Sequence, residues 1–156
     1  MDLNKFTERA RGFVQAAQTI ALREGHQRLT PEHILKALLD DDQGMAANLI
    51  THAGGNMARV SEAVETAIGK LPKVSGDAGQ IYLDGQTAKV LDEAGKVAEK
   101  AGDSFVPVQR VLQALTMADN DAGRALKSAG VDVKSLEAAI QDVTKGRAAH
   151  SAGAEE

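Results

Sequence analysis

The stretch LTPEHILKALL, residues 29–39, contains a complete helix start followed by an apolar run. Thr30 is a good N-cap, Pro31 suits the first helical position, and Glu32 places a negative charge in the first turn. Apolar residues then recur at helical spacing, which predicts a helix with a buried face. These residues are Ile34, Leu35, Leu38 and Leu39.

A second copy of this stretch lies 77 residues further along the chain. Residues 106–116 read VPVQRVLQALT, with leucines at 112 and 115 where the first copy has leucines at 35 and 38. Matching residues continue on both sides, at a spacing of 77 and later of 76. Such self-similarity at a fixed period indicates two copies of one structural unit. The match pairs Phe6 with Leu83, Gly25 with Gly102, Ala53-Gly54 with Ala129-Gly130, and Asn56 with Asp132.

Each copy predicts four helices, so the expected fold is all-α, with two pseudo-symmetric four-helix repeats. Phe6 opens the apolar stripe of the first helix, and Gly25 can end that helix. Asn56 and Asp132 are predicted N-caps of the last helix in each copy. Aromatic residues make up only 3% of the chain, so small aliphatic residues must fill the helix contacts. The expected helices cover residues 6–21, 31–39, 45–50, 57–68, 90–98, 108–115, the surroundings of 126, and 133–143.

The stretch between the copies has no helical period and contains Pro72, Gly76 and Gly79, which predicts a loop with one extended piece. The expected organisation is one domain over residues 1–146. Within it, repeat one spans about 4–69, the loop 70–83, and repeat two about 84–146. Residues 147–156 are small, polar and aperiodic, which is typical of a flexible linker.

Composition excludes several classes of function. The chain has 18 Lys plus Arg against 22 Asp plus Glu and a net charge of -4, which argues against nucleic-acid binding. It has no cysteine, so disulfides, thiolate zinc sites and thiol nucleophiles are excluded. No signal peptide is visible at the start, and no stretch approaches the roughly 18 apolar residues of a membrane span. We therefore expect a cytoplasmic location and no membrane contact.

Motifs for catalysis and metal binding are missing. The Gly-Lys pairs at 69–70 and 95–96 are not followed by Ser or Thr, so no phosphate-binding loop is present. None of the four histidines stands in the Glu-x-x-His pattern of di-iron bundles, and no Gly-x-Ser-x-Gly turn occurs. His33 is expected at the surface or in a local hydrogen bond. The residues alone predict a helical domain that binds another protein, with no catalytic or metal site and no cofactor.

Four phrases in this order resemble one known family, the Clp N-terminal domain of the bacterial Hsp100 disaggregase chaperones. The similarity runs from about Asn4 to Gly146. The four phrases are NKFTERARGFVQAAQTIA, LTPEHILKALLDD, HAGGN and AEKAGDSFVPVQRVLQAL.

The resemblance implies a function that composition does not show. In that family a double repeat of four helices forms the mobile outer domain of an ATP-driven hexamer that acts in the heat-shock response. The domain engages unfolded or aggregated polypeptide and helps deliver it to the pore, and an Hsp70 system supplies aggregates. ATP and magnesium would then belong to the parent protein, and residues 147–156 would begin the linker to its ATPase module. The isolated domain is expected to be a monomer.

The resemblance also implies where clients bind. The family's contact positions match Thr7 and Asp103, while Gln109 stands where an acidic residue is usual. Pro107 aligns with the capping Thr30, so the start of the helix that follows it is expected to differ locally. Without the resemblance, Thr7 and Asp103 read equally well as a helix cap and a turn residue.

Four apolar residues near these positions are candidates for a peptide groove: Val97, Phe105, Val108 and Val111. The three valines stand at core spacing, so core packing is the alternative interpretation for them. Phe105 aligns with Arg28, which favours an exposed position and makes Phe105 the preferred apolar contact.

Three other functions stay open on the sequence. The same double repeat could dock an adaptor protein for a protease-associated Clp chaperone. A helical bundle could also carry an enzyme or metal site, although the motifs are missing. A purely structural cap on the hexamer, without client contact, is the third alternative.

Overall fold

The structure is a computed structural model that describes residues 2–41, 44–74 and 80–155. Within these residues the chain is mainly helical, with a short 3-10 turn at Leu3–Lys5 and two strands of two residues each, β1 (Arg28–Leu29) and β2 (Tyr82–Leu83). The helices are α1 (Glu8–Arg23), α2 (Pro31–Asp40), α3 (Met45–His52), α4 (Met57–Gly69), α5 (Gly85–Lys100), α6 (Val108–Met117), α7 (Asp121–Ser128) and α8 (Val133–Thr144).

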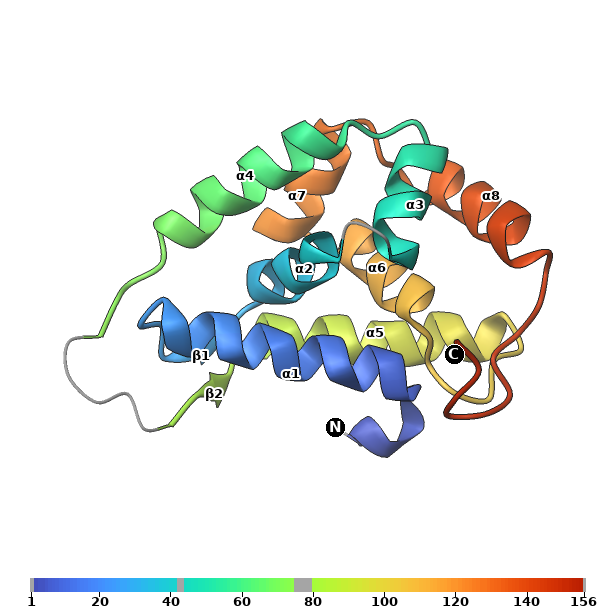
Figure 1. Cartoon of the computed structure of the whole chain (residues 1–156), viewed down its shortest axis with the longest axis horizontal. Helices are drawn as coiled ribbons and strands as arrows, with labels where there is room; N and C mark the ends of the chain where they lie inside the picture. Colours follow the sequence, from blue (N-terminus) through green and yellow to red (C-terminus); the bar gives the residue numbers. More distant parts are fainter. Residues whose placement is uncertain (1, 42–43, 75–79, 156) are drawn as a thin grey trace.

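The helices confirm the expected all-α fold of two four-helix repeats, since α1 to α4 correspond in order to α5 to α8. In Figure 1, α1 and α5 both run along the lower edge of the view, with α2 and α6 above them. The helix α2 packs on α1, and α6 packs on α5. The repeats also interlock, because α4 packs on α7 and α3 packs on α8. Neither repeat therefore buries its apolar surface alone.

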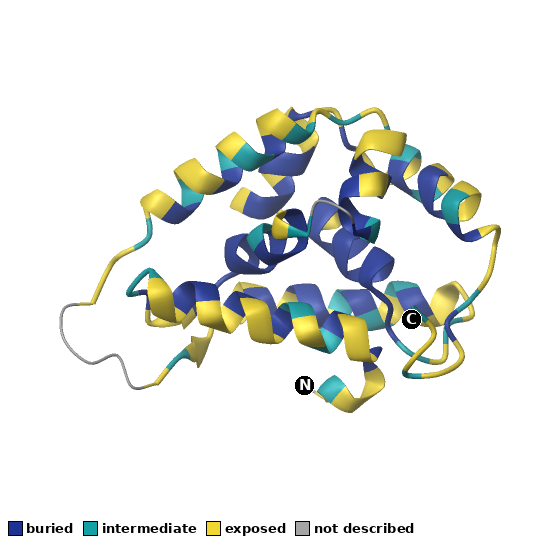
Figure 2. Cartoon of the chain, in the orientation of Figure 1, coloured by how far each residue is buried: buried dark blue, intermediate teal, exposed yellow. Residues whose placement is uncertain are grey.

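The central helices α2 and α6 are buried on nearly every side, as Figure 2 shows. In α6 every residue from Val108 to Thr116 is buried. Helices that are enclosed in this way need apolar residues on all faces, or polar residues with partners. The largest fully buried side chains are Leu29, Ile34, Leu35, Leu38, Leu49, Ile50, Leu91, Leu112, Leu115, Leu126, Leu136 and Ile140.

The turn between α3 and α4 contacts the turn between α7 and α8, at the upper edge of the view in Figure 1. The Asn56 amide donates to the Ala129 carbonyl over 2.9 Å. A Cβ atom at Gly55 would lie 2.4 Å from the Cγ2 atom of Val131, so only glycine permits this approach. Asn56 and Asp132 cap α4 and α8 with their side chains, as the sequence predicts.

The expectation that Phe6 begins the first helix is wrong. Thr7 is the N-cap of α1, and its hydroxyl accepts a 3.2 Å hydrogen bond from the Ala10 amide, so the helix starts at Glu8. Phe6 is extended and forms a parallel bridge with Val106. The repeat spacing matches Phe6 with Leu83 and Leu29 with Val106. These equivalent residues pair in the same way, since Leu29 of β1 lies opposite Leu83 of β2. Pairing over such sequence distances has no local signal.

The segment after α8 turns back onto the domain. Lys145 adopts a left-handed conformation with φ of 57°, which ends the helix. Residues 147–155 then run to the region where α1 begins and α5 ends, as the red trace in Figure 1 shows. The sequence favours a flexible linker here, whereas in the structure this segment packs against the start of α1 and the turn after α5. Of the loop predicted between the repeats, Gly76 and Gly79 lie outside the described residues.

Candidate functional site

The start of α1 lies beside the turn between α5 and α6. The Thr7 amide donates to the Val106 carbonyl over 3.0 Å, and the Val106 amide donates to the Lys5 carbonyl over 2.8 Å. The Thr7 side chain is fully buried in this contact. The structure thus places Thr7 and Asp103 on one side of the molecule, although 96 residues separate them in the sequence.

A buried ion pair fixes the Asp103 turn. The Asp103 Oδ2 atom lies 3.6 Å from the Arg110 Nε atom, and the two side chains are 3% and 5% exposed. The Arg110 guanidinium also donates to Glu137 over 2.9 Å and to Gln113 over 2.7 Å. Because an unpaired buried charge is costly, this network holds the turn against α6. Asp103 therefore has a structural role besides any binding role.

A groove of about 840 Å³ runs between the N-terminal segment, α5 and the Asp103 turn. Half-buried Phe105 lines this groove together with Phe6 and Leu91, so its wall is apolar. Charged residues stand around the same groove, among them Lys5, Asp92, Lys96 and Glu99. An apolar wall with polar groups around it is the general form of a peptide-binding groove.

The start of α6 differs from the start of α2, as the sequence predicts. Pro107 occupies the N-cap position and has no side chain that can accept a hydrogen bond. Instead, the Glu155 carboxylate accepts a 3.1 Å hydrogen bond from the Val108 amide and another from the Thr7 hydroxyl. Burial raises the pKa of Glu155 and the Asp103 charge adds to the rise, whereas the two hydrogen bonds and Arg9 act in the opposite direction.

The other predicted site residues lie in different environments. Val97 is half-buried and lines a separate surface cleft with Met117. The side chains of Val108 and Val111 lie in the core, as their spacing allowed. Gln109 is 5% exposed, and within the described residues its side-chain oxygen has no hydrogen-bond partner. The structure brings Thr7, Asp103 and Phe105 together at one surface.

A buried histidine pair lies at the equivalent position of repeat one. His33 is in the local hydrogen-bond arrangement that the sequence allowed, because its Nδ1 atom accepts from the Thr30 amide over 3.0 Å. Its Nε2 atom lies 2.9 Å from the Nδ1 atom of His26. The network assigns the His33 proton to Nε2, which donates to His26. Burial, with a smaller effect of His26, lowers the pKa of His33 to about 4.

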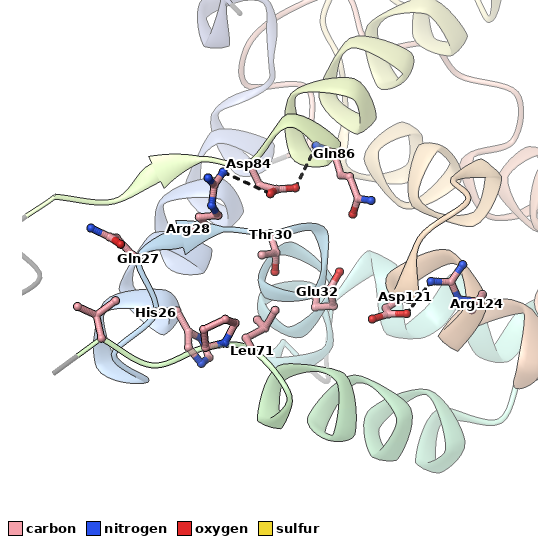
Figure 3. Close-up of a pocket in the computed structure, with 12 residues that line it drawn as sticks. His26, Gln27, Arg28, Thr30, Glu32, Leu71, Asp84, Gln86, Asp121 and Arg124 are labelled. Atoms are coloured by element: carbon pink, nitrogen blue, oxygen red, sulfur yellow. Dashed lines mark hydrogen bonds and ion pairs between the residues drawn. The ribbon is translucent and has the colours of Figure 1, made fainter.

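Figure 3 shows the cavity beside this pair, which has a volume of about 420 Å³. Charged side chains surround it, with Asp84 3.8 Å from Arg28 and Asp121 2.7 Å from Arg124. Burial raises the pKa of Glu32, which also lines the cavity. The repeat spacing of 77 could have located this second site, since it maps Asp103 onto His26, Arg110 onto His33 and Pro107 onto Thr30.

The fold and the duplicated architecture define a Clp N-terminal domain. The chain belongs to this family, because the family profile, the Clp repeat (R) N-terminal domain, matches residues 5–129. The similar proteins include the chaperone protein ClpB of Rhodopseudomonas palustris, 55% identical over 157 residues, which cover 99% of this chain and 18% of that protein. ClpB of Rickettsia felis is 36% identical over 156 residues, with the same two coverages. The chain therefore spans 18% of the length of these relatives.

Solved structures share the fold at low sequence identity. The N-terminal domain of Hsp104 from Candida albicans superposes with a TM-score of 0.83 at 22% identity, covering 97% of this chain and 99% of that one. A ClpV N-domain in complex with a VipB peptide gives a TM-score of 0.71 at 18% identity, covering 97% and 96%. Among the described residues, no helix combines the length and apolar character that a membrane crossing requires.

Proposed function

We propose that this chain is the substrate-engaging N-terminal domain of an ATP-dependent protein disaggregase. It binds unfolded or aggregated polypeptide and helps deliver it to the pore of a hexamer. The observation that carries the proposal is the groove beside Phe105, which offers an apolar wall next to the polar groups of the Asp103 turn. Unfolded clients expose apolar side chains, and these suit such a wall.

The relatives support this role. Family membership and the similarity to ClpB associate the chain with a chaperone. The ClpV N-domain, which shares the fold, was solved with a bound peptide. In the proposed parent protein, ATP and magnesium act in other modules, and an Hsp70 system supplies the aggregates. Six copies around one ring would raise the effective concentration of weak sites.

Adaptor docking is the second candidate function. The cavity of Figure 3 favours it, because its lining carries acidic and basic side chains from α2, α7 and the start of α5. A fixed protein partner can match such a charge pattern, whereas varied clients cannot. The cavity and the groove share no lining residue, so binding experiments can separate the two candidates.

Loss of the aromatic wall tests client binding. Phe105→Ser should weaken the affinity for a reduced and carboxymethylated, permanently unfolded polypeptide by about tenfold, because an aromatic contact contributes on the order of 1–2 kcal/mol. Leu22→Ser is the matched control, since Leu22 is 50% exposed on α1, outside the groove lining. Fluorescence anisotropy measures the affinity, and thermal unfolding checks the fold. Equal affinities in the two variants would contradict the proposed site.

A further inference from the structure

The segment that follows α8 occupies the surface beside Thr7 and Asp103. The Ala149 carbonyl accepts hydrogen bonds from the amides of Ser104 and Phe105, over 2.7 and 3.1 Å. The Ala149 amide donates to the Asp103 Oδ1 atom over 2.6 Å. The turn thus binds both the amide and the carbonyl group of Ala149.

Further along the segment, Ala152 makes a main-chain contact and Glu155 makes side-chain contacts. The Glu8 amide, in the first turn of α1, donates to the Ala152 carbonyl over 2.7 Å. The Glu155 carboxylate then reaches the Val108 amide and the Thr7 hydroxyl. Residues 152–155 form a turn, in which the Ala154 amide donates to the Ser151 carbonyl over 3.2 Å. The main-chain contacts at Ala149 and Ala152 use no side chain of the segment, so they tolerate many sequences.

Two features of the segment are nevertheless selective. Ala149 is only 5% exposed, so its position excludes a large side chain. Glu155 supplies the cap that Pro107 cannot supply, because the Val108 amide faces no side chain of its own turn. A carboxylate at a helix start also interacts favourably with the helix dipole.

The course of the segment has a counterpart in repeat one. In repeat one, the connector after α4 returns over the equivalent turn, and the Val74 amide donates to the Gly25 carbonyl over 2.8 Å. Leu71, Pro72 and Val74 line the cavity beside His26. The segment after α8 follows the same course over the Asp103 turn. Both connectors therefore cover the turn before a central helix, although they form different hydrogen bonds there.

We propose that residues 149–155 are an internal ligand of the surface beside Thr7 and Asp103, which adjoins the groove at Asp103, Ser104 and Phe105, and that clients must displace them. The site accepts segments that place a small residue at the Asp103 turn and a carboxylate at the start of α6. This inference rests on the proposed client-binding function and adds the chemical class of the bound segment.

Release of the segment is the first step of the test. Ala149→Arg in the 156-residue chain introduces a long charged side chain at a buried position. Ala138→Arg, at an exposed position of α8, makes the same charge change as a control. In the wild type and the control, the amides of Ser104, Phe105 and Val108 should exchange slowly with solvent. In Ala149→Arg their exchange should be at least about tenfold faster.

Addition of the peptide RAAHSAGAE, residues 147–155, to the isotope-labelled Ala149→Arg variant should return these amide shifts toward their wild-type positions. The affinity for the permanently unfolded polypeptide should rise about tenfold in this variant if the segment occupies the site nine-tenths of the time. The control should bind like the wild type.

Fast exchange of the Ser104 and Phe105 amides in the wild type would overturn the inference. So would an Ala149→Arg variant that loses protection but binds the polypeptide no more tightly, and that result would leave the proposed function standing. If no variant binds the polypeptide while wild-type protection persists, both the inference and the proposed function fail.

Discussion

Residues at corresponding positions of the two repeats hold the turn before a central helix through different interactions. Repeat one buries the neutral pair His26 and His33, while repeat two buries the ion pair Asp103 and Arg110. Both pairs connect the turn before a central helix to that helix. The neutral pair stabilises only while it stays unprotonated, whereas the ion pair needs both of its charges.

The histidine pair predicts a stability change with pH. His33 has a pKa of about 4 in the folded chain against an ordinary value of 6.5. A histidine with a lowered folded pKa contributes stability above pH 6.5, and this contribution is lost as the pH falls from 6.5 through 4. The loss approaches about 3 kcal/mol at the acid end, taking roughly 1.4 kcal/mol per pKa unit.

His33→Gln is the variant that checks this prediction. Glutamine keeps a side chain that can complete the capping box with Thr30, but it does not titrate. Its free energy of unfolding should therefore fall less than that of the wild type between pH 7 and pH 4.5. Urea unfolding at both pH values measures the difference. The same fall in both proteins would refute the assignment.

At the scale of elements, the contact between α6 and α7 depends on a glycine. A Cβ atom at Gly123 would lie 2.0 Å from the Ala118 carbonyl oxygen and 2.9 Å from that of Leu115. Gly123→Ala should therefore destabilise the fold by about 2 kcal/mol, despite the better helix propensity of alanine. In contrast, a Cβ at Gly12 of α1 meets nothing within 4 Å, so Gly12→Ala should stabilise by about 0.5–1 kcal/mol. Chemical unfolding of both variants tests this contrast, which opposite signs of the two effects would confirm.

The helices could be predicted from the sequence because their signals are local. Asn56 and Asp132 form caps where the sequence places them. The extended piece predicted in the loop between the repeats corresponds to β2. The strand pairing could not be predicted, because Phe6 and Leu29 find their partners far along the chain. The packed position of residues 147–155 could not be predicted for a different reason. Small residues suggest a flexible chain, yet the small size of Ala149 is what lets it lie buried against the Asp103 turn.

At the scale of the whole molecule, duplication produces two similar corners with different surfaces. The corner with Asp103 has a groove whose apolar wall contains Phe105, and the corner with His26 has a cavity beside a buried histidine pair. Thr7 and Asp103 were placed at the site by the family resemblance, and Phe105 by its alignment with Arg28. Val108 and Val111 could not be assigned by pattern, because core and groove residues share the same helical spacing.

The most direct measurement is a titration of the isotope-labelled 156-residue chain with a permanently unfolded polypeptide, followed by backbone NMR shifts. Binding at the proposed site predicts shift changes at Thr7, Ser104, Phe105 and Val108, together with changes in residues 149–155 as the segment leaves. Shift changes confined to the corner around His26 and Asp84, or a titration without any change, would contradict client binding at the groove.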